Sequence, residues 1–303
     1  MGDVAVEVRG LRKSYGRLEA VKGIDLTIER GEVFALVGPN GAGKTTTVEI
    51  LEGFRRRTAG DVKVLGHDPD KADRDLRARV GIVLQSTGVD PYLKVRETVQ
   101  LYAGYYPRPR SVDEVIDVVG LSDKRDTKVL RLSGGQQRRL DVAIALAGDP
   151  ELLFLDEPTS GFDPGARRNA WDIVRNLTDL GKTVFLTTHY MDEAENLANR
   201  VAVISSGEIV AEGPPGSLGG RQLPETVIRF RLLGNAGELP TRIGLTMEGN
   251  GSVEVRTKEP VRVLHELTGW ALDRGVDVLD LRVTKPTLED VYLELTGGEA
   301  GVE

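Results

Sequence analysis

The stretch that decides the fold reads Gly38-Pro39-Asn40-Gly41-Ala42-Gly43-Lys44-Thr45 and is followed by Thr46. It fits the pattern G-x-x-x-x-G-K-[ST], with an apolar strand, Glu32–Val37, before it and a helical segment, Thr46–Leu51, after it. Glycines let backbone N–H groups turn inward around phosphates, and a helix N-terminus adds positive potential there. The sequence therefore predicts a nucleoside triphosphate site in which Lys44 reaches the β- and γ-phosphate oxygens and Thr45 can ligate Mg²⁺.

A second motif lies about 110 residues further along the chain, where the apolar run Leu152–Leu155 ends in Asp156 and Glu157. The carboxyl ends of parallel strands meet at one edge of a sheet, which is also the edge that a phosphate loop occupies. Asp156 suits the outer sphere of a metal ion, and Glu157 could orient or deprotonate a water molecule. Acidic strand ends are common, so it is the pairing with the phosphate loop that favours a catalytic interpretation.

A third motif is Leu132-Ser133-Gly134-Gly135-Gln136, directly before a segment that is predicted to be helical, Gln137–Ala147. A serine and two glycines at the start of a helix can bind an anion. The spacing Ser-x-x-Gln is also that of a capping box, and local chemistry alone favours this ordinary explanation.

Taken together, the three motifs resemble the ATP-binding cassette (ABC) family, whose signature LSGGQ is matched here without a difference. The resemblance covers Val4 to about Pro214, and further positions of the family pattern follow in order. Tyr15 matches the aromatic residue that stacks on adenine, Gln85 the glutamine that touches the metal ion, and His189 the histidine that contacts the γ-phosphate. The resemblance implies catalytic roles for Lys44, Glu157 and His189. It implies a metal site of Thr45, Gln85 and Asp156, and ATP contacts from Tyr15, the loop Gly38–Thr46 and the signature residues Ser133, Gly134, Gly135 and Gln136.

The pattern of apolar runs predicts an α/β fold. Val33–Val37, Val80–Leu84, Leu152–Leu155 and Val184–Leu186 are short and β-branched or leucine-rich, as in buried parallel strands joined by crossover helices. Earlier in the chain, Val4–Val8 and Ile24–Ile28 alternate between apolar and polar residues, which indicates an antiparallel, half-exposed sheet.

Helical segments follow one another over residues 95–147. They are expected at Val95–Tyr106, Ser111–Val119 and Gly134–Ala147, so we expect a helical insertion at about 87–147. The complete prediction is a P-loop NTPase cassette with a parallel core sheet, an N-terminal antiparallel β part and this insertion.

Dense glycine and proline punctuation at Gly213–Gly220 marks a boundary. We therefore place a nucleotide-binding domain at residues 1–215 and a small α+β domain at 216–303. Its expected elements are strands at Thr226–Leu233, Ser252–Thr257 and Val278–Val283, and helices at Pro260–Arg274 and Thr287–Leu295. The segment Lys285–Gly297 is similar to the ending of ATP-binding subunits of daunorubicin-resistance-type exporters.

Composition narrows the function further. The 303 residues are 40% hydrophobic and 29% charged, with a net charge of −7, so non-specific attachment to nucleic acid is disfavoured. Arg55-Arg56-Arg57 and Arg108-Pro109-Arg110 lack interleaved aromatic residues and are predicted to be solvated loops. Cysteine is absent, which excludes thiol chemistry. The N-terminus lacks the apolar core of a signal peptide, and no apolar run approaches the ~18 residues of a spanning helix.

The resemblance then implies a function. Two cassettes are expected to close head to tail, so that Ser133–Gln136 of one chain covers the ATP held by Lys44 and Thr45 of the other. This homodimer would hydrolyse ATP with Mg²⁺ and power export of a drug or lipid-like molecule through a membrane permease on a separate chain, at the cytoplasmic face of the membrane. An importer ATPase is an open variant. A soluble cassette protein acting on ribosomes or DNA is the alternative class, but such relatives typically carry two cassettes or a long coiled coil. A P-loop kinase or GTPase would lack the LSGGQ signature.

Overall fold

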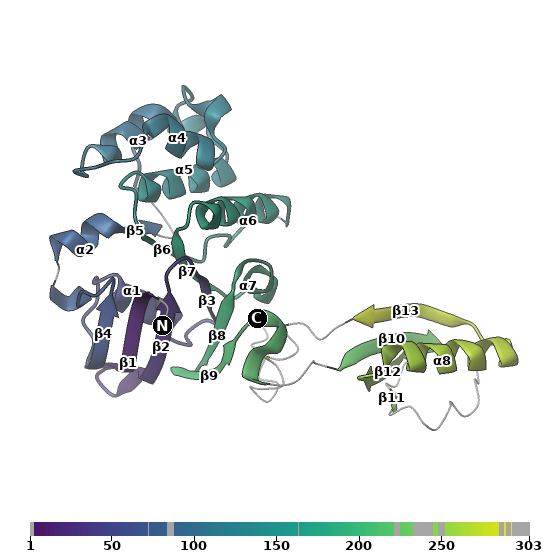
Figure 1. Ribbon diagram of the computed structural model, residues 1–303. Coiled ribbons are helices and arrows are strands. Elements are labelled where there is room, and N and C mark those ends of the chain that lie inside the picture. Colours follow the sequence, from purple (N-terminus) through teal and green to yellow (C-terminus); the bar gives the residue numbers. More distant parts are fainter. Residues whose placement is uncertain are drawn as a thin grey trace. The chain divides into compact units, whose positions relative to one another are not determined.

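The computed structural model describes residues 3–71, 73–83, 88–162, 164–220, 225–232, 245–247 and 252–284, together with Leu288 and Tyr292. The chain forms two compact units that divide between Pro215 and Gly216 (Figure 1). The first unit contains two sheets and the second unit one, and each unit has its own apolar core.

The first unit is built on a six-stranded sheet in the order β5-β6-β7-β3-β8-β9. All neighbouring strands are parallel except β8 and β9, which form an antiparallel hairpin around Ser206-Gly207. The strands are β3 (Val33–Val37), β5 (Val80–Val83), β6 (Leu152–Asp156), β7 (Thr183–Thr188), β8 (Arg200–Ser205) and β9 (Glu208–Gly213). Every residue of β3 and β7 is buried, which explains why these strands are apolar throughout and do not alternate.

A three-stranded antiparallel sheet stands beside this core, in the order β2-β1-β4. Its strands are β1 (Val4–Tyr15), β2 (Leu18–Glu29) and β4 (Ala59–Val64). Alternation in β1 and β2 buries one side of the sheet, as the sequence predicted, whereas β4 was not predicted. Phe34, Phe154 and Phe185 join the core of the parallel sheet, with ring centroids of neighbouring pairs 5.9 and 5.6 Å apart.

Helices cover the parallel sheet and extend the unit on one side (Figure 1). They are α1 (Lys44–Leu51), α2 (Arg74–Arg79), α3 (Val95–Ala103), α4 (Val112–Val118), α5 (Gly134–Leu146), α6 (Pro164–Asp179) and α7 (Met191–Leu197), with short 3-10 turns η1 (Pro69–Lys71), η2 (Ser122–Lys124) and η3 (Val129–Arg131). A further 3-10 turn, η4 (Pro215–Gly220), spans the division between the two units. The expected row of helices is confirmed in α3, α4 and α5: α3 ends at Ala103, three residues before the predicted limit, and α4 and α5 each end one residue before it. The α/β cassette predicted from the sequence is therefore observed.

The second unit is a four-stranded antiparallel sheet in the order β11-β12-β10-β13, with helix α8 packed on it. The elements are β10 (Thr226–Leu232), β11 (Leu245–Met247), β12 (Ser252–Thr257), α8 (Pro260–Arg274) and β13 (Val278–Thr284). Proline opens α8, and Gly275, with φ of 61°, closes it. Apart from Leu288 and Tyr292, the helix expected at Thr287–Leu295 lies outside the described residues.

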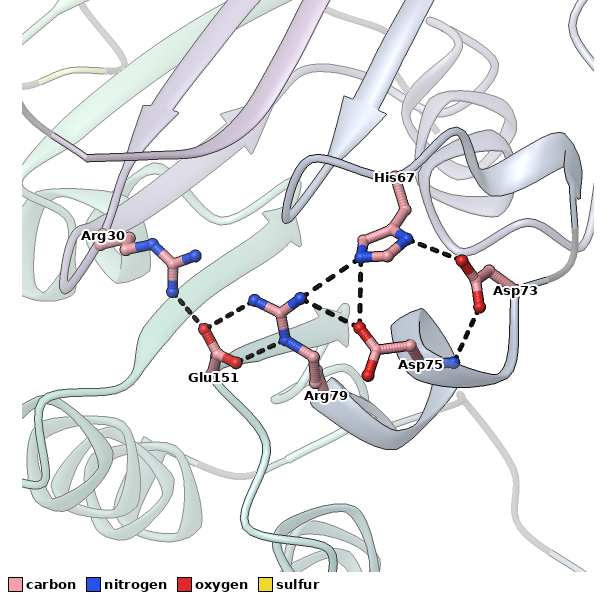
Figure 2. A network of polar contacts seen from close by, with 6 residues as sticks. All are labelled: Arg30, His67, Asp73, Asp75, Arg79 and Glu151. Carbon is pink, nitrogen blue, oxygen red and sulfur yellow. Dashed lines mark hydrogen bonds and ion pairs between the residues drawn. The ribbon is translucent and has the colours of Figure 1, made fainter.

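A polar network ties distant parts of the first unit together (Figure 2). Glu151, just before β6, accepts hydrogen bonds from Arg79 Nε at 2.5 Å and Nη2 at 3.1 Å, and it pairs with Arg30, which follows β2. His67 lies 2.7 Å from Asp73 and 3.2 Å from Asp75. Hydrogen bonds from Arg79 hold the pKa of Glu151 down at about 2. The network therefore stabilises the ionised carboxylate of Glu151 in the folded state.

We expect the Glu151→Gln variant to have a lower free energy of unfolding than the wild type at pH 7. The folded-state pKa lies below its ordinary value of 4.5, so the contribution is present above pH 4.5 and is lost as the pH falls towards 2. Solvent screening limits it to about 0.5–1 kcal/mol. Urea unfolding followed by circular dichroism at pH 7 and pH 3.5 measures the difference, which should shrink at the lower pH. Glu114→Gln, which breaks an exposed pair with Arg110, is the matched control with a smaller effect. Equal stability of Glu151→Gln and wild type at pH 7 would contradict the assignment.

Candidate functional site

The phosphate loop connects β3 to α1 and is held close to neighbouring strands. A Cβ atom on Gly38 would lie 2.2 Å from the carbonyl oxygen of Ile204, and one on Gly43 would lie 2.7 Å from that of Ala20. Gly43 also has a φ of 107°, which side-chain-bearing residues rarely adopt. These two glycines are therefore required by the packing of the loop, whatever it binds.

A cavity of about 360 Å³ opens over this loop. It is lined by residues from the loop, from α1, from β2 and from the end of β6: Ala20, Asn40, Gly41, Gly43, Lys44, Thr45, Thr46 and Glu157. Most of the predicted phosphate contacts thus share one concave surface with the predicted catalytic glutamate. Backbone N–H groups at the start of α1 and the Lys44 ammonium make this surface suited to an anion.

Lys44 is the charged group at the centre of the site. Its side chain is only 5% exposed, and Nζ donates to the carbonyl oxygens of Gly38 at 2.7 Å and Pro39 at 3.1 Å. Burial lowers the pKa of Lys44, whereas the nearby Glu157 and Asp156 raise it. A phosphate in the cavity would offer this buried cation stronger acceptors than two neutral carbonyl groups.

The two predicted carboxylates lie at the end of β6, beside β7. Asp156 pairs with Thr187 in the parallel register, and the Thr187 hydroxyl donates to Asp156 Oδ1. Burial raises the pKa of Asp156, and the charge of Glu157 raises it further. The ionised form of Asp156 is therefore costly without a cation nearby. Such a carboxylate fits Mg²⁺, which prefers one or two carboxylates together with substrate phosphates.

Glu157 is brought together with two other predicted catalytic residues. Its Oε1 lies 3.2 Å from His189 Nδ1 and 3.9 Å from Lys44 Nζ. His189 follows the last residue of β7, so the pairing of β6 with β7 accounts for its place next to Glu157. The geometry allows Glu157 to take a proton from a water molecule while His189 and Lys44 lie beside its carboxylate.

Tyr15 stands at the end of β1 with 40% of its surface exposed, and it is not among the residues that line the cavity. Lys13 Nζ lies 5.0 Å from its ring centroid and the Arg55 guanidinium 5.3 Å. The ring therefore remains available at the surface, in contact with two cations.

The signature residues form the N-terminus of α5. Gln136 N–H donates to Ser133 Oγ at 3.3 Å, and Ser133 N–H donates to Gln136 Oε1 at 3.0 Å, which is the capping box that the spacing allowed. Ser133, Gly134, Gly135 and Gln136 line a separate cavity of about 690 Å³. One chain therefore does not place its own signature in the phosphate cavity.

The metal-site prediction is only partly described. Thr45 and Asp156 lie on α1 and β6, but Gln85 lies outside the described residues. In the described ranges there is no group of three His, Cys, Asp or Glu side chains that could hold a metal ion by itself. A cation here would therefore depend on oxygen atoms from a bound nucleotide as well as from the protein.

The arginine clusters do not form free basic patches. Arg57 donates to Asp68 at 2.8 Å and Asp70 at 2.9 Å and is largely buried, contrary to the solvated loop that the sequence predicted. Arg55 donates to Glu49 at 2.5 Å, and Arg110 donates to Asp149 at 3.3 Å. These cations are largely compensated within the chain.

Two residues near the site were not found from the sequence. The hydroxyl and carbonyl groups of Thr187 contact Asp156 and Glu157, and the side chain of Arg138 reaches the backbone on both sides of Glu157. Thr187 directly follows the predicted strand Val184–Leu186 and lies two residues before His189, which was a usable signal. Nothing in the sequence around Arg138 distinguished it from Arg139.

Comparisons with known proteins agree with this geometry. The family model described as ABC transporter matches residues 21–160, and a model for a C-terminal domain of ABC transporter domain-containing proteins matches residues 226–287. The daunorubicin resistance ATP-binding protein DrrA3 of Streptomyces coeruleorubidus is 36% identical over 313 residues, covering 100% of this chain and 99% of the relative. The Nod factor export ATP-binding protein I of Sinorhizobium fredii is 40% identical, covering 98% of this chain and 87% of the relative.

Solved structures show the same fold. An ATP-binding cassette in a dimeric, post-hydrolysis state bound to ADP and phosphate is 28% identical, with a TM-score of 0.61, and covers 72% of this chain and 99% of its own. The phosphate loop, the acidic strand end, the signature helix and these matches lead to one conclusion: the chain belongs to the ATP-binding cassette family, as the ATP-hydrolysing, ATP-binding subunit of an ABC transporter.

Proposed function

We propose that this chain binds Mg²⁺-ATP at the cavity over the phosphate loop and hydrolyses it with Glu157 as the general base. The observation that carries this proposal is the position of Glu157 Oε1, 3.2 Å from His189 and 3.9 Å from Lys44 in the same cavity as the loop. A base must lie within reach of the water that attacks the γ-phosphate, and Glu157 is the carboxylate that lines this cavity.

The other residues divide the remaining work. Lys44 and the N–H groups of Gly38–Thr46 hold the phosphates, Tyr15 stacks on adenine, and His189 contacts the γ-phosphate and orients Glu157. Thr45, Asp156 and Gln85 would hold Mg²⁺, which neutralises charge on the phosphates when bound. Lys44 would also offset the negative charge that develops on the γ-phosphate during hydrolysis. Its ammonium group is buried, and an electrostatic interaction is stronger where water is excluded.

The complete site requires a second copy of the chain. Ser133–Gln136 line a cavity other than the one over the phosphate loop, so one copy leaves the open face of a bound γ-phosphate without donors from its signature. The dimeric form of the similar solved cassette supports closure of two chains, each covering the nucleotide of the other with the N-terminus of α5.

ATP hydrolysis by the closed pair would power the export of a small molecule, a drug or a lipid-like compound, through a permease on a separate chain. The names of the relatives, daunorubicin resistance and Nod factor export, support export over import. Across the described residues, none of the helices combines the length and the apolar character that a membrane span requires. We place the chain at the cytoplasmic face of the membrane, against a permease and with no nucleic acid partner, because its relatives are ATP-binding proteins of export and drug resistance.

The surface that would meet the permease lies along the described residues 88–119 of the helical insertion. Large apolar side chains are exposed there, at Tyr92, Leu101 and Tyr105. Aromatic residues at an exposed position are typical of protein interfaces. The second candidate function, a soluble cassette acting on ribosomes or DNA, names no partner that would cover these exposed apolar side chains.

We expect Glu157→Gln to bind ATP but to hydrolyse it ~10²–10⁴ times more slowly, since the amide cannot accept the proton. ATP without Mg²⁺ should then hold two chains together, as a dimer on size-exclusion chromatography. Ser133→Arg in the same background should abolish the dimer while one chain still binds ATP. Lys44→Ala is the control that loses both, because the nucleotide itself is lost. Full turnover by Glu157→Gln would remove Glu157 from the catalytic role.

A membrane partner is the second expected result. The cross-linked chain, solubilised from membranes of its native cells, should co-purify with a polytopic membrane protein. Leu101→Asp with Tyr105→Asp should weaken that capture without changing ATP affinity, whereas Val210→Asp, at an exposed position of β9, should not. ATP-dependent sedimentation with ribosomes and no membrane partner would favour the soluble alternative.

The C-terminal unit should not be needed for nucleotide binding. Every residue assigned to ATP precedes the division at Pro215, and the second unit has its own sheet and core. A fragment ending at Pro215 should bind a fluorescent ATP analogue within about twofold of the full chain's affinity. A fragment that gives a folded circular dichroism spectrum but does not bind the analogue would contradict this division of roles.

A further inference from the structure

Arg138 is an arginine with little access to solvent. It lies on α5, two residues after the signature motif ends, and its side chain is 11% exposed. Burial lowers its pKa, but the nearby charges of Asp141, Asp156 and Glu193 raise it. A guanidinium group at this depth is stable only when its donors are used, so its acceptors indicate its role.

Two of these acceptors flank Glu157. Arg138 Nη2 donates to the carbonyl oxygen of Asp156 at 3.0 Å, and Arg138 Nε donates to that of Pro158 at 3.3 Å. Asp141, one turn along the same helix, lies 3.8 Å from Nη1. The rigid guanidinium plane thus spans the backbone before and after the proposed general base.

The backbone of Glu157 is itself strained. Its φ is 46°, in the left-handed region that a residue with a long side chain rarely adopts. The peptide N–H of Glu157 donates to the Thr187 carbonyl oxygen and to the Thr187 hydroxyl, both at 3.1 Å. Such a conformation persists only where the surroundings fix it, and here β7 holds the N–H side while α5 holds the two carbonyl groups.

We propose that Arg138 is a positioning residue for hydrolysis: it locks the left-handed backbone at Glu157 and thereby ties the helix that begins at the signature to the general base of the same chain. The inference rests on the proposed role of Glu157. In the closed pair, α5 would touch the nucleotide of one site while Arg138 holds the base of the other. Each chain would then couple the two sites through a single buried side chain.

The main test replaces Arg138 with methionine, which keeps an unbranched apolar stem and removes every donor. We expect kcat for ATP hydrolysis to fall about ten- to hundredfold, the cost of a misplaced catalytic group. Affinity for trinitrophenyl-ATP should stay within about twofold, because the phosphate loop is untouched. Arg138→Lys, which can reach one carbonyl group but not both, should recover part of the rate.

Arg139→Met is the matched control on the same helix. Arg139 Nη1 donates to the carbonyl oxygen of Gly120, away from Glu157, at 3.2 Å. Its kcat should stay within about threefold of the wild type. An equal fall in both variants would overturn the inference, because it would show a general effect on α5.

A cycle with Glu157→Gln separates positioning from stability. Since Arg138 acts through Glu157, adding Arg138→Met to Glu157→Gln should lower the residual rate no further, and the ATP-bound dimer should persist. A further loss equal to that seen in the wild type, or loss of the dimer, would overturn the inference. Full turnover by Glu157→Gln alone would instead refute the proposed function. If Arg138→Met does not give a folded circular dichroism spectrum, Arg138→Lys is taken through the same cycle with the same outcomes.

Discussion

The parallel pairing of β6 with β7 and of β7 with β3 is the constraint on which the site depends. In this register Asp156 stands opposite Thr187, and Thr188 stands opposite Val37. Three loops therefore leave the sheet at the same edge: the phosphate loop after β3, Glu157 after β6 and His189 after β7. A shift of β6 along β7 would separate Glu157 from His189, even if every residue were kept.

Electrostatics explains why this edge suits a triphosphate. Lys44 is buried beside two carboxylates, and burial raises the pKa of Asp156 while it lowers that of Lys44. Each group would be more stable in its charged form with a counter-charge nearby. Magnesium can supply it to Asp156 and phosphate to Lys44, so the ligand satisfies groups that the fold alone leaves costly. Under the proposed function, a metal–nucleotide pair would therefore compensate both groups, whereas an anion alone would compensate only Lys44.

Much of this arrangement could be predicted because its signals are local. The phosphate loop reads as a contiguous pattern, and the buried strands appear as short apolar runs whose identity does not depend on their neighbours. The order of α3, α4 and α5 also follows from periodicity along the chain. Tertiary partners could not be predicted in the same way. Arg30 and Glu151 are 121 residues apart, and Arg79 is 72 residues from Glu151, so no pattern along the chain identifies this network. The strand β4 was not predicted for the same reason: its own composition does not indicate a strand, and it forms one because it pairs with β1.

The two least predictable contacts around Glu157 also differ in kind from the motif residues. Motif residues are proposed to touch the nucleotide, so their types follow from the chemistry of phosphates and water. Thr187 and Arg138 instead touch the backbone of Glu157, where any donor or acceptor of the right reach would serve. A strained φ of 46° at the proposed general base makes such support necessary, because the backbone would otherwise relax and carry the carboxylate away from His189. The helix that supplies the support begins with the signature residues. A rigid helix moves as one body, so a nucleotide in a second chain that displaces the N-terminus of α5 would also move Arg138. That movement would reach the carbonyl groups of Asp156 and Pro158. Closure over one nucleotide would in this way position the general base at the other.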